Sequence, residues 1–370
     1  MFLQRFKKVL PTGLALFSTI FGAGNLIFPL LTGQLVGGSY ILGTLGFMLP
    51  SVVMCVLGYM GIMACKGDPK EYFSELPRWM YWFMVTVILC VMGPFYIIPR
   101  SVLTALGGVK EVYPQIHAAY FSFFFCAVSF LMAIKEDQVM DILGKYITPL
   151  KLGGILSVIF GALYFLPHDQ LSHTTAFFAI TEGIQDGYQP MDLLGTIFFS
   201  GMIYRFLTEG LKKENIQDPN ELQKRTALVG MIGFVCVGFV YLLLLFVGAK
   251  YSAQVMGVEK ALILPRITSI ALGKPAAIMI AFVLFFSTLA TAVAFFSIFT
   301  NFLVKDILKN KISPLVGLLV TFGISYGMSL IGLDAIINFI GTYILSWLYP
   351  CIMLFVVFKY VKTRTTLKAL

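Results

Sequence analysis

Long apolar runs, separated by short polar segments, cover most of the chain. A helix needs about 20 mostly apolar residues to cross a lipid bilayer, and the alternating pattern of membrane β-barrel strands is absent from the sequence. We therefore predict an all-α polytopic membrane protein in which residues 1–370 form a single transmembrane domain. The ten predicted spans lie at residues 10–31, 41–64, 80–106, 117–134, 147–166, 174–207, 226–249, 275–304, 313–331 and 335–358.

The composition agrees with this pattern and excludes a soluble protein. Hydrophobic residues make up 58% of the chain and charged residues only 12%, whereas a typical soluble domain is about 25% charged. The 6 cysteines form no CxxC pair, and nearly all of them lie in apolar stretches. We therefore expect buried thiols there, and neither a disulfide framework nor a cysteine metal site.

The basic residues predict an orientation in the membrane. If the N-terminus is cytoplasmic, 21 of the 27 Lys and Arg residues fall on the cytoplasmic side, as the positive-inside rule requires. Both termini are then predicted to be cytoplasmic. The net charge of +9 is thereby explained as an orientation signal, so the expected partner is the lipid bilayer, with no nucleic acid and no obligate protein partner.

Two of the predicted spans contain helix-breaking sequences near their middle. The first span carries Gly22, Gly24 and Asn25 within four residues, and the sixth carries Gly187 and Pro190. Glycine weakens a helix, and proline removes a backbone donor. Each break alone is also compatible with close helix packing or a simple kink. Matched breaks in two halves of five spans, however, indicate inverted repeats, here residues 10–166 and 174–358, with a binding site at the breaks.

A broken helix in the membrane offers polar groups to a ligand. The free N–H groups of a half-helix bind an anion, and its loose carbonyls bind a cation. A ligand with a carboxylate and an apolar side chain therefore suits the site. Aromatic residues near the breaks are candidate liners of such a pocket, although each is equally compatible with ordinary packing: Phe17, Phe21, Phe95, Tyr96, Tyr188 and Phe198.

A few ionisable and polar residues fall within the predicted spans. A carboxylate at mid-membrane costs about 2.5–3.5 kcal/mol on insertion scales, so Asp192 should face the protein interior. It is a candidate partner of a substrate amine, a proton carrier, or a structural partner of the broken backbone. Asn25 is expected to cap the second half of the first span or to contribute an oxygen ligand. Arg100, at the outer end of the third span, is a candidate gate or an interface anchor.

Enzymatic and channel functions receive no support from the sequence. No HExxH or GxSxG motif and no pair of mid-span carboxylates is present, so we expect no enzyme, no catalytic residues and no cofactor. A continuous selectivity filter or a ring of charges is also missing. A secondary transporter is the remaining class.

Four segments resemble the bacterial branched-chain amino-acid:cation symporters, a family with the LeuT-like fold of five-plus-five inverted repeats. These segments are residues 21–29 (FGAGNLIFP), 93–100 (GPFYIIPR), 187–192 (GYQPMD) and 348–350 (LYP). The resemblance implies import of leucine, isoleucine and valine with Na⁺ or H⁺ across a bacterial cytoplasmic membrane. It also implies alternating access, in which spans 1, 2, 6 and 7 rock against the others. Another small neutral amino acid such as methionine, or a purine-like solute, is the alternative substrate.

The resemblance also implies the positions of the ligands. The amides of Ala23 and Gly24 would meet the substrate carboxylate, and Asn25 beside them is a further candidate for substrate binding, through the ligand amine. Tyr188 and Gln189, next to Gly187 and Asp192, would meet the substrate amine or cap the pocket. The implied Na⁺ site, the only metal site expected, uses the carbonyls of the first span and the hydroxyls of the eighth: Ser18, Phe21, Ser287, Thr288 and Thr291.

The sequence departs from the family pattern in three respects. Family members usually carry two adjacent hydroxyls in the eighth span, where this chain has Ala290 and Thr291. Lys151 stands in the fifth span where the family is apolar, and some members of the wider superfamily use a lysine amine in place of Na⁺. Lys151 is thus a candidate cation surrogate, or else it extends to the cytoplasmic interface. The family also generally has twelve spans, whereas ten are predicted here.

Overall fold

The computed structural model describes residues 2–134, 148–167, 173–216 and 218–369. Within these ranges the chain is almost entirely helical and forms no β-strand, only an isolated bridge between Gly37 and His173. The predicted all-α fold class is therefore confirmed. Of the predicted spans, only the first residue of 147–166 lies outside the described residues.

The first five predicted spans are all present as helices. A short helix, α5 (Pro69–Tyr72), separates the second span from the third. The bounds are α1 (Phe2–Ile20) and α2 (Gly24–Val36) for the first span; α3 (Tyr40–Met48), the π-helical turn η1 (Leu49–Val53) and α4 (Met54–Ala64) for the second; α6 (Arg78–Cys90), η2 (Val91–Phe95) and α7 (Ile97–Val112) for the third; α8 (Ala118–Ala133) for the fourth; and α10 (Thr148–Tyr164) for the fifth.

The second five spans follow the same order of elements. A short helix, α14 (Ile263–Leu272), again lies between the second and third spans of the half. The bounds are α11 (Ala176–Tyr188) and α12 (Asp192–Lys213) for the sixth span; α13 (Pro219–Lys250) for the seventh; η4 (Lys260–Leu262) before α14; α15 (Lys274–Asn301) and η5 (Phe302–Ile307) for the eighth; α16 (Pro314–Ile331) for the ninth; and α17 (Leu333–Ile336), η6 (Ile337–Ile344) and α18 (Leu345–Ala369) for the tenth.

Length and apolarity support a polytopic membrane protein. Among the described residues, 6 helical stretches are long and apolar enough to cross a membrane, and the pair α1 and α2 passes together as a span bent by 68°. Helices α8 and α10 are shorter and also apolar. The sixth predicted span is divided between α11 and α12. Both halves thus begin with a broken span, although their relation as inverted repeats stays a prediction.

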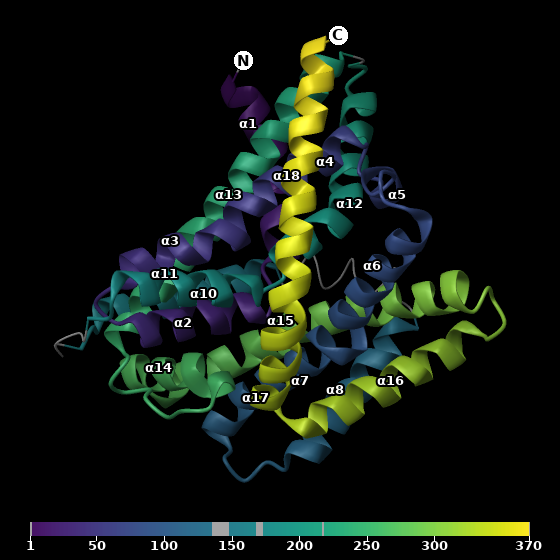
Figure 1. The fold of residues 1–370 in the computed structure, drawn as a ribbon. Coiled ribbons are helices and arrows are strands. Elements are labelled where there is room, and N and C mark those ends of the chain that lie inside the picture. The colour runs from purple at the N-terminus through teal and green to yellow at the C-terminus, as the bar shows by residue number, and fades with distance from the viewer. Residues whose placement is uncertain (1, 135–147, 168–172, 217, 370) are drawn as a thin grey trace.

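The helices pack closely around the two broken spans. Helices α2, α3 and α11 lie side by side and are covered by α13, while α7 and α15 form the other large contact (Figure 1). Helix α1 and the end of α18 lie at the same end of the molecule (Figure 1). An even number of spans places both termini on the same side of the membrane.

Glycines allow the helices around the breaks to approach one another. A Cβ atom on Gly33 would lie 2.0 Å from the carbonyl oxygen of Leu245, and one on Gly248 would lie 2.2 Å from that of Leu30. These two contacts join α2 to α13 backbone to backbone. Because lipid provides no hydrophobic force between helices, close van der Waals packing of small residues stabilises such pairs.

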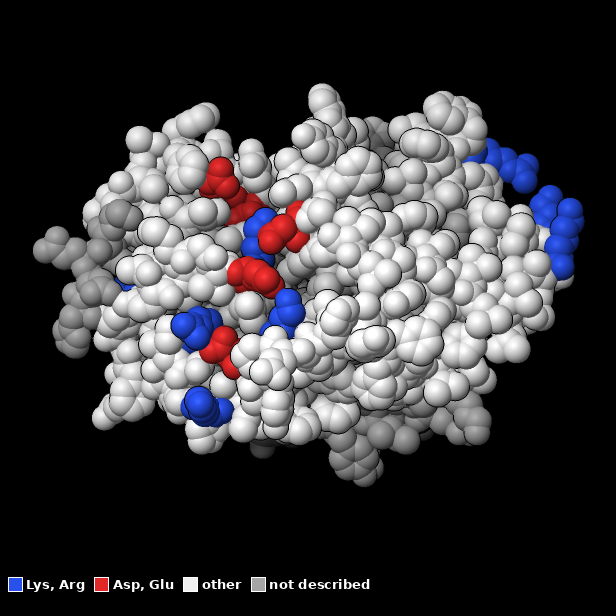
Figure 2. Space-filling model, turned by 90° about the horizontal axis from the view of Figure 1, so that it is seen from below, with Lys and Arg blue, Asp and Glu red and all other residues white. Residues whose placement is uncertain are grey.

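Charged groups gather outside the apolar body of the protein. Glu75, in the loop before α6, accepts hydrogen bonds from Lys359 and Lys362 of α18, both at 2.8 Å. These two hydrogen bonds hold the pKa of Glu75 below its usual value. Figure 2 shows a second cluster, in which acidic and basic side chains mix on an otherwise largely uncharged face. Ion pairs between the elements at the lower end of Figure 1 are Lys110–Glu259, Lys260–Asp334 and Arg266–Glu111.

We predict that replacing Gly33 with alanine destabilises the protein. The added methyl group would overlap the Leu245 carbonyl, and overpacking of this kind costs about 1–3 kcal/mol. Gly327 is the matched control, since a Cβ atom there meets nothing within 4 Å. Thermal unfolding of purified protein in detergent should show a lower midpoint for G33A and an equal or higher midpoint for G327A. Equal midpoints for G33A and the wild type would contradict the packing described here.

Candidate functional site

The first break lies between α1 and α2, and two of its backbone groups form hydrogen bonds with side chains. The N–H of Gly22 donates to Oδ1 of Asn25 at 2.7 Å. The carbonyl oxygen of Phe21 accepts a hydrogen bond from Nζ of Lys151, which reaches it from α10. The Gly22 N–H and the Phe21 carbonyl therefore have partners inside the protein, as polar groups at membrane depth require, while the first N–H groups of α2 have no side-chain cap among the described residues.

The second break lies between α11 and α12. Met191 has a φ of 63°, in the left-handed region that a non-glycine residue rarely adopts. The carbonyl oxygen of Gln189 accepts a hydrogen bond from Nη1 of Arg100 at 2.6 Å. The N–H of Leu193 donates to the hydroxyl of Tyr349 at 3.0 Å. This break too is closed by side chains from other spans.

A buried hydrogen-bonded cluster joins the two breaks. Nδ2 of Asn25 donates to Oδ1 of Asp192 at 2.7 Å, and the hydroxyl of Tyr241 donates to Oδ2 of Asp192. Asn25 also donates to the Tyr241 hydroxyl. The three side chains are at most 1% exposed. We call these residues the break cluster; they bring together the first, sixth and seventh spans.

Asp192 occupies the first turn of α12, where a negative charge is favoured by the helix dipole. Both of its carboxylate oxygens accept hydrogen bonds from protein side chains. Of the three roles expected for it, this geometry agrees best with a structural partner of the broken backbone. Its roles toward a substrate amine or a proton stay predictions.

Arg100 lies inside the protein and not at the membrane interface. Arg100 is only 2% exposed. The alternative expectation, that Arg100 anchors the protein at the membrane interface, is therefore wrong. The guanidinium carbon lies 4.7 Å from the centre of the Tyr96 ring and 5.6 Å from that of Phe28. The Tyr96 hydroxyl donates to Oε1 of Gln189 at 2.6 Å. Arg100 and Tyr96 thus both hold the sixth-span break from α7, and the role of Arg100 as a gate stays a prediction.

Lys151 also lies inside the protein. It is 5% exposed, and its ammonium group stays at the first break and does not extend to the cytoplasmic interface. Its nitrogen lies 5.6 Å from the centre of the Phe21 ring. The amine therefore contacts one of the two carbonyls that the family resemblance implies for a cation.

The expected hydroxyls of the eighth span lie on the buried side of α15. Ser287 and Thr288 are both buried, and the Ser287 hydroxyl has no hydrogen-bond partner among the described residues. The Thr291 hydroxyl donates to the carbonyl of Ser287 at 3.2 Å and lies 3.9 Å from a Cβ built on Gly22. A hydroxyl of α15 thus faces the first break beside Phe21, and oxygen ligands for Na⁺ are available there.

The predicted aromatic liners differ in their surroundings. Phe95 is 36% exposed, and Phe198 packs against both the main core and a small cluster that includes Val85 and Phe302, so their role as pocket liners stays a prediction. The ring of Tyr188 stacks on that of Tyr349 with centroids 5.2 Å apart. These aromatic residues were inferred from their position in the sequence, which does not show the side of the helix that each one occupies.

Neither Tyr241 nor Tyr349 was predicted as a site residue, although Tyr349 lies in the segment 348–350 that carries part of the family resemblance. Tyr241 lies in a run of valine, leucine and phenylalanine, where a lone hydroxyl is a weak but usable signal of a buried polar contact. Asp186 of α11 was also overlooked as a site residue; it accepts a hydrogen bond from Thr32 of α2 at 2.7 Å. It forms a second polar link between the two broken spans.

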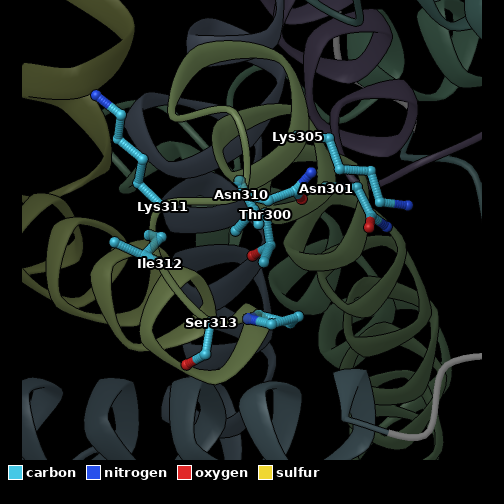
Figure 3. A pocket seen from close by; sticks show the side chains of 9 residues that line it. Thr300, Asn301, Lys305, Asn310, Lys311, Ile312 and Ser313 are labelled. Atoms are coloured by element: carbon cyan, nitrogen blue, oxygen red, sulfur yellow. The ribbon is translucent and has the colours of Figure 1, made fainter.

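A cavity of about 370 Å³ lies away from both breaks, between the end of α15 and the start of α16. Thr300, Asn301 and Ser313 are among its lining residues. Figure 3 shows that Lys305 and Lys311 extend in different directions, away from the residues between them. The two basic groups therefore do not converge on a common ligand, and the breaks remain the candidate site.

A polytopic helical protein whose two broken spans meet at a buried polar cluster has the architecture of a secondary transporter. The comparisons agree with this class. The profile of a family described as "Branched-chain amino acid transport protein" matches residues 5–369. The chain therefore belongs to this family, which is a family of transporters and not of enzymes, and the predicted family resemblance is confirmed.

Curated relatives extend over most of the chain. The branched-chain amino acid permease BrnQ of Corynebacterium glutamicum is 25% identical over 93% of this chain and 78% of its own length. The branched-chain amino acid permease BraB of Bacillus subtilis is 26% identical over 96% of this chain and 80% of its own length. The predicted class of branched-chain amino acid transporter is thus supported along nearly the full sequence.

A solved structure confirms the fold. A Na⁺-coupled sialic acid symporter in a substrate-bound, outward-open state matches with a TM-score of 0.60 and 10% sequence identity. The match covers 94% of this chain and 78% of the symporter. At this identity the likeness shows the fold alone, that of a polytopic all-α membrane protein, and leaves the inverted repeats, the ligands and the coupling as predictions.

We predict that Y241F lowers the stability of the protein more than the loss of a hydroxyl from another buried tyrosine does. Removing a hydrogen bond to a charged group costs about 1.5–3 kcal/mol, against about 1 kcal/mol for a neutral one. Y59F is the matched control, since buried Tyr59 donates only to the carbonyl of Thr226, at 3.2 Å. Chemical unfolding in detergent should place Y241F below Y59F in stability. Equal losses of stability in Y241F and Y59F would show that the Tyr241–Asp192 hydrogen bond contributes no more to stability than the Tyr59–Thr226 hydrogen bond.

Proposed function

We propose that this protein imports leucine, isoleucine and valine across the bacterial cytoplasmic membrane by alternating access, with both termini in the cytoplasm. The observation that carries the proposal is the meeting of two broken spans at the break cluster, in a chain of the branched-chain amino acid transport family. The free N–H groups at the start of α2 suit the carboxylate of an amino acid.

The apolar side of the breaks supports a hydrophobic side chain on the substrate. The rings of Phe17 and Phe21 stack with centroids 5.0 Å apart, and Phe21 lies 6.0 Å from Tyr241. Burial of a leucine-sized side chain among such rings contributes roughly 1.5–3 kcal/mol. The amino acid would then have its carboxylate at the helix terminus and its side chain among the rings.

We expect branched-chain amino acids to compete with one another for this site. Uptake of labelled leucine into proteoliposomes should be inhibited by isoleucine and valine, and only weakly by methionine or a purine base. The reason is that a branched side chain fills a short apolar pocket that a linear or flat solute fills poorly. Leucine uptake that isoleucine and valine leave unchanged, but that methionine or a purine inhibits, would replace the branched-chain assignment with one of these alternatives.

For coupling, we propose that the Lys151 ammonium takes the place of a bound cation at the first break. It donates to the Phe21 carbonyl, in the position where the family resemblance implies Na⁺. A second cation beside it would suffer like-charge repulsion in a medium of low dielectric constant. Proton transfer to and from this amine would then couple transport to the proton gradient. Inward movement of one positive charge provides about 2.3 kcal/mol per 100 mV of membrane potential.

Sodium coupling is the second candidate, and one observation favours it. The Ser287 hydroxyl is buried without a partner among the described residues, and the Thr291 hydroxyl, one turn further along α15, faces the first break. Oxygen ligands of this kind suit Na⁺. The two modes of coupling differ in which gradient drives uptake.

We predict that a pH gradient, acidic outside, drives leucine accumulation without Na⁺, and that K151M abolishes this accumulation. Methionine keeps most of the volume of the lysine side chain but binds no proton, so K151M should retain leucine exchange between the two sides. K250M is the matched control, because Lys250 also lies beside an aromatic ring, at 5.8 Å from the centre of Phe246. Accumulation driven by a Na⁺ gradient alone, or unchanged in K151M, would contradict proton coupling through Lys151.

A further inference from the structure

Arg100 carries a buried positive charge that forms no direct ion pair among the described residues, although Asp192 lies near enough to interact with it electrostatically. The residue is 2% exposed, and within the described residues its guanidinium forms no ion pair. Asp192, the acidic group of the break cluster, already accepts hydrogen bonds from Asn25 and Tyr241. An unpaired charge of this kind is costly to bury, so the site calls for an anion.

The guanidinium also has an unused donor. Nε of Arg100 is buried and has no hydrogen-bond partner among the described residues, while Nη1 donates to the Gln189 carbonyl. The rings of Phe28 and Tyr96 lie beside the group, with their centres 5.6 and 4.7 Å from Cζ. Arginine presents its donors in a rigid fork whose geometry matches a carboxylate.

The same guanidinium lies against the N-terminus of α2. A Cβ atom on Gly24, the first residue of that helix, would lie 2.7 Å from Nη2 and 2.8 Å from Cζ of Arg100. No side chain caps this helix terminus. The first N–H groups of a helix carry partial positive charge and bind anions. Two positive groups therefore meet at one point, and within the described parts of the chain neither is in direct contact with a carboxylate.

We propose that Arg100 binds the carboxylate of the transported amino acid, between its guanidinium and the N–H groups at the start of α2. This assignment rests on the proposed function, and it makes Arg100 a binding residue in addition to a link to Gln189. The substrate class is then defined by the carboxylate. An α-amino acid binds, whereas the same molecule with an uncharged amide or alcohol in place of the carboxylate does not.

The close approach explains why position 24 requires glycine. A methyl group there would overlap the end of the arginine side chain. Because that end is flexible, the methyl group would displace the guanidinium without breaking the helix packing. G24A therefore changes the same contact as an Arg100 substitution while leaving the charge in place.

The test compares leucine with leucinamide, which lacks the carboxylate charge, as competitors of labelled leucine on the purified full-length protein. At about pH 6 the amine of both compounds is largely protonated, so the carboxylate is the main difference. The wild type should prefer leucine by at least about tenfold, the range expected for charge-assisted hydrogen bonds. In R100Q and G24A the preference should fall to within about twofold, since both compounds then bind equally weakly.

A purely structural role of Arg100 gives a different result. R100Q would then weaken leucine and leucinamide by the same factor and preserve the preference, which would overturn the proposal. R100K, which keeps the charge but not the fork, should retain an intermediate preference. K110Q is the matched control on α7, because partly buried Lys110 pairs only loosely with Glu259 at 3.7 Å, and it should retain the full preference.

The outcomes also separate this inference from the proposed function. A wild type that binds leucine and leucinamide equally would overturn the carboxylate assignment while leaving leucine transport intact. A wild type that binds no leucine at all would contradict the proposed function, and the role of Arg100 with it. If R100Q does not fold, G24A provides the same comparison with the native charge present.

Discussion

The hydrogen bonds from Asn25 and Tyr241 to Asp192 are the contacts on which the rest of the structure depends. Lipid offers no water to satisfy a broken backbone or a carboxylate, so two interrupted spans are tolerated only if protein groups replace the missing partners. Asp192 supplies the negative charge, Asn25 bridges from the first break, and Tyr241 completes the set from α13. Without this cluster, the Asp192 carboxylate at the second break would lose its partners, and without Asn25 the Gly22 N–H at the first break would lose its acceptor.

The proposed cycle involves two groups of helices that move against each other, and the break cluster lies within one of these groups. Its members belong to the first, sixth and seventh spans, which the family resemblance assigns to the moving group. Arg100 reaches the sixth-span break from the third span, and Lys151 reaches the first break from the fifth. The two buried cations thus contact the breaks from the other group of helices. In the proposed cycle, a carboxylate at Arg100 and a proton at Lys151 each change a contact between the two groups.

The sequence predicted the membrane class, the spans and both helix breaks, because length, apolarity and the helix-breaking residues are local properties. It also named Asn25, Asp192, Lys151 and Arg100 as the polar residues to examine. It could not place them relative to one another. Lys151 was expected either to replace a cation or to reach the interface, and only the packing of α10 against the first break shows that it is buried.

The errors have the same physical origin. Arg100 was placed at the outer end of its span by counting residues, but the turn η2 and the start of α7 bring it to the sixth-span break. Tyr241 was overlooked because a tyrosine in an apolar run gives no sign of the partner it meets on another helix. Phe95 and Phe198 were expected to line the pocket from their position along the chain alone, and their role there stays a prediction.

A structure of the protein with leucine bound would test the central claim most directly, namely that an amino acid binds where the two broken spans meet. The account predicts density for leucine with its carboxylate between the guanidinium of Arg100 and the start of α2, and its side chain near Phe21. Leucine bound only in the cavity beside Thr300 and Ser313, with the two breaks unchanged, would contradict it.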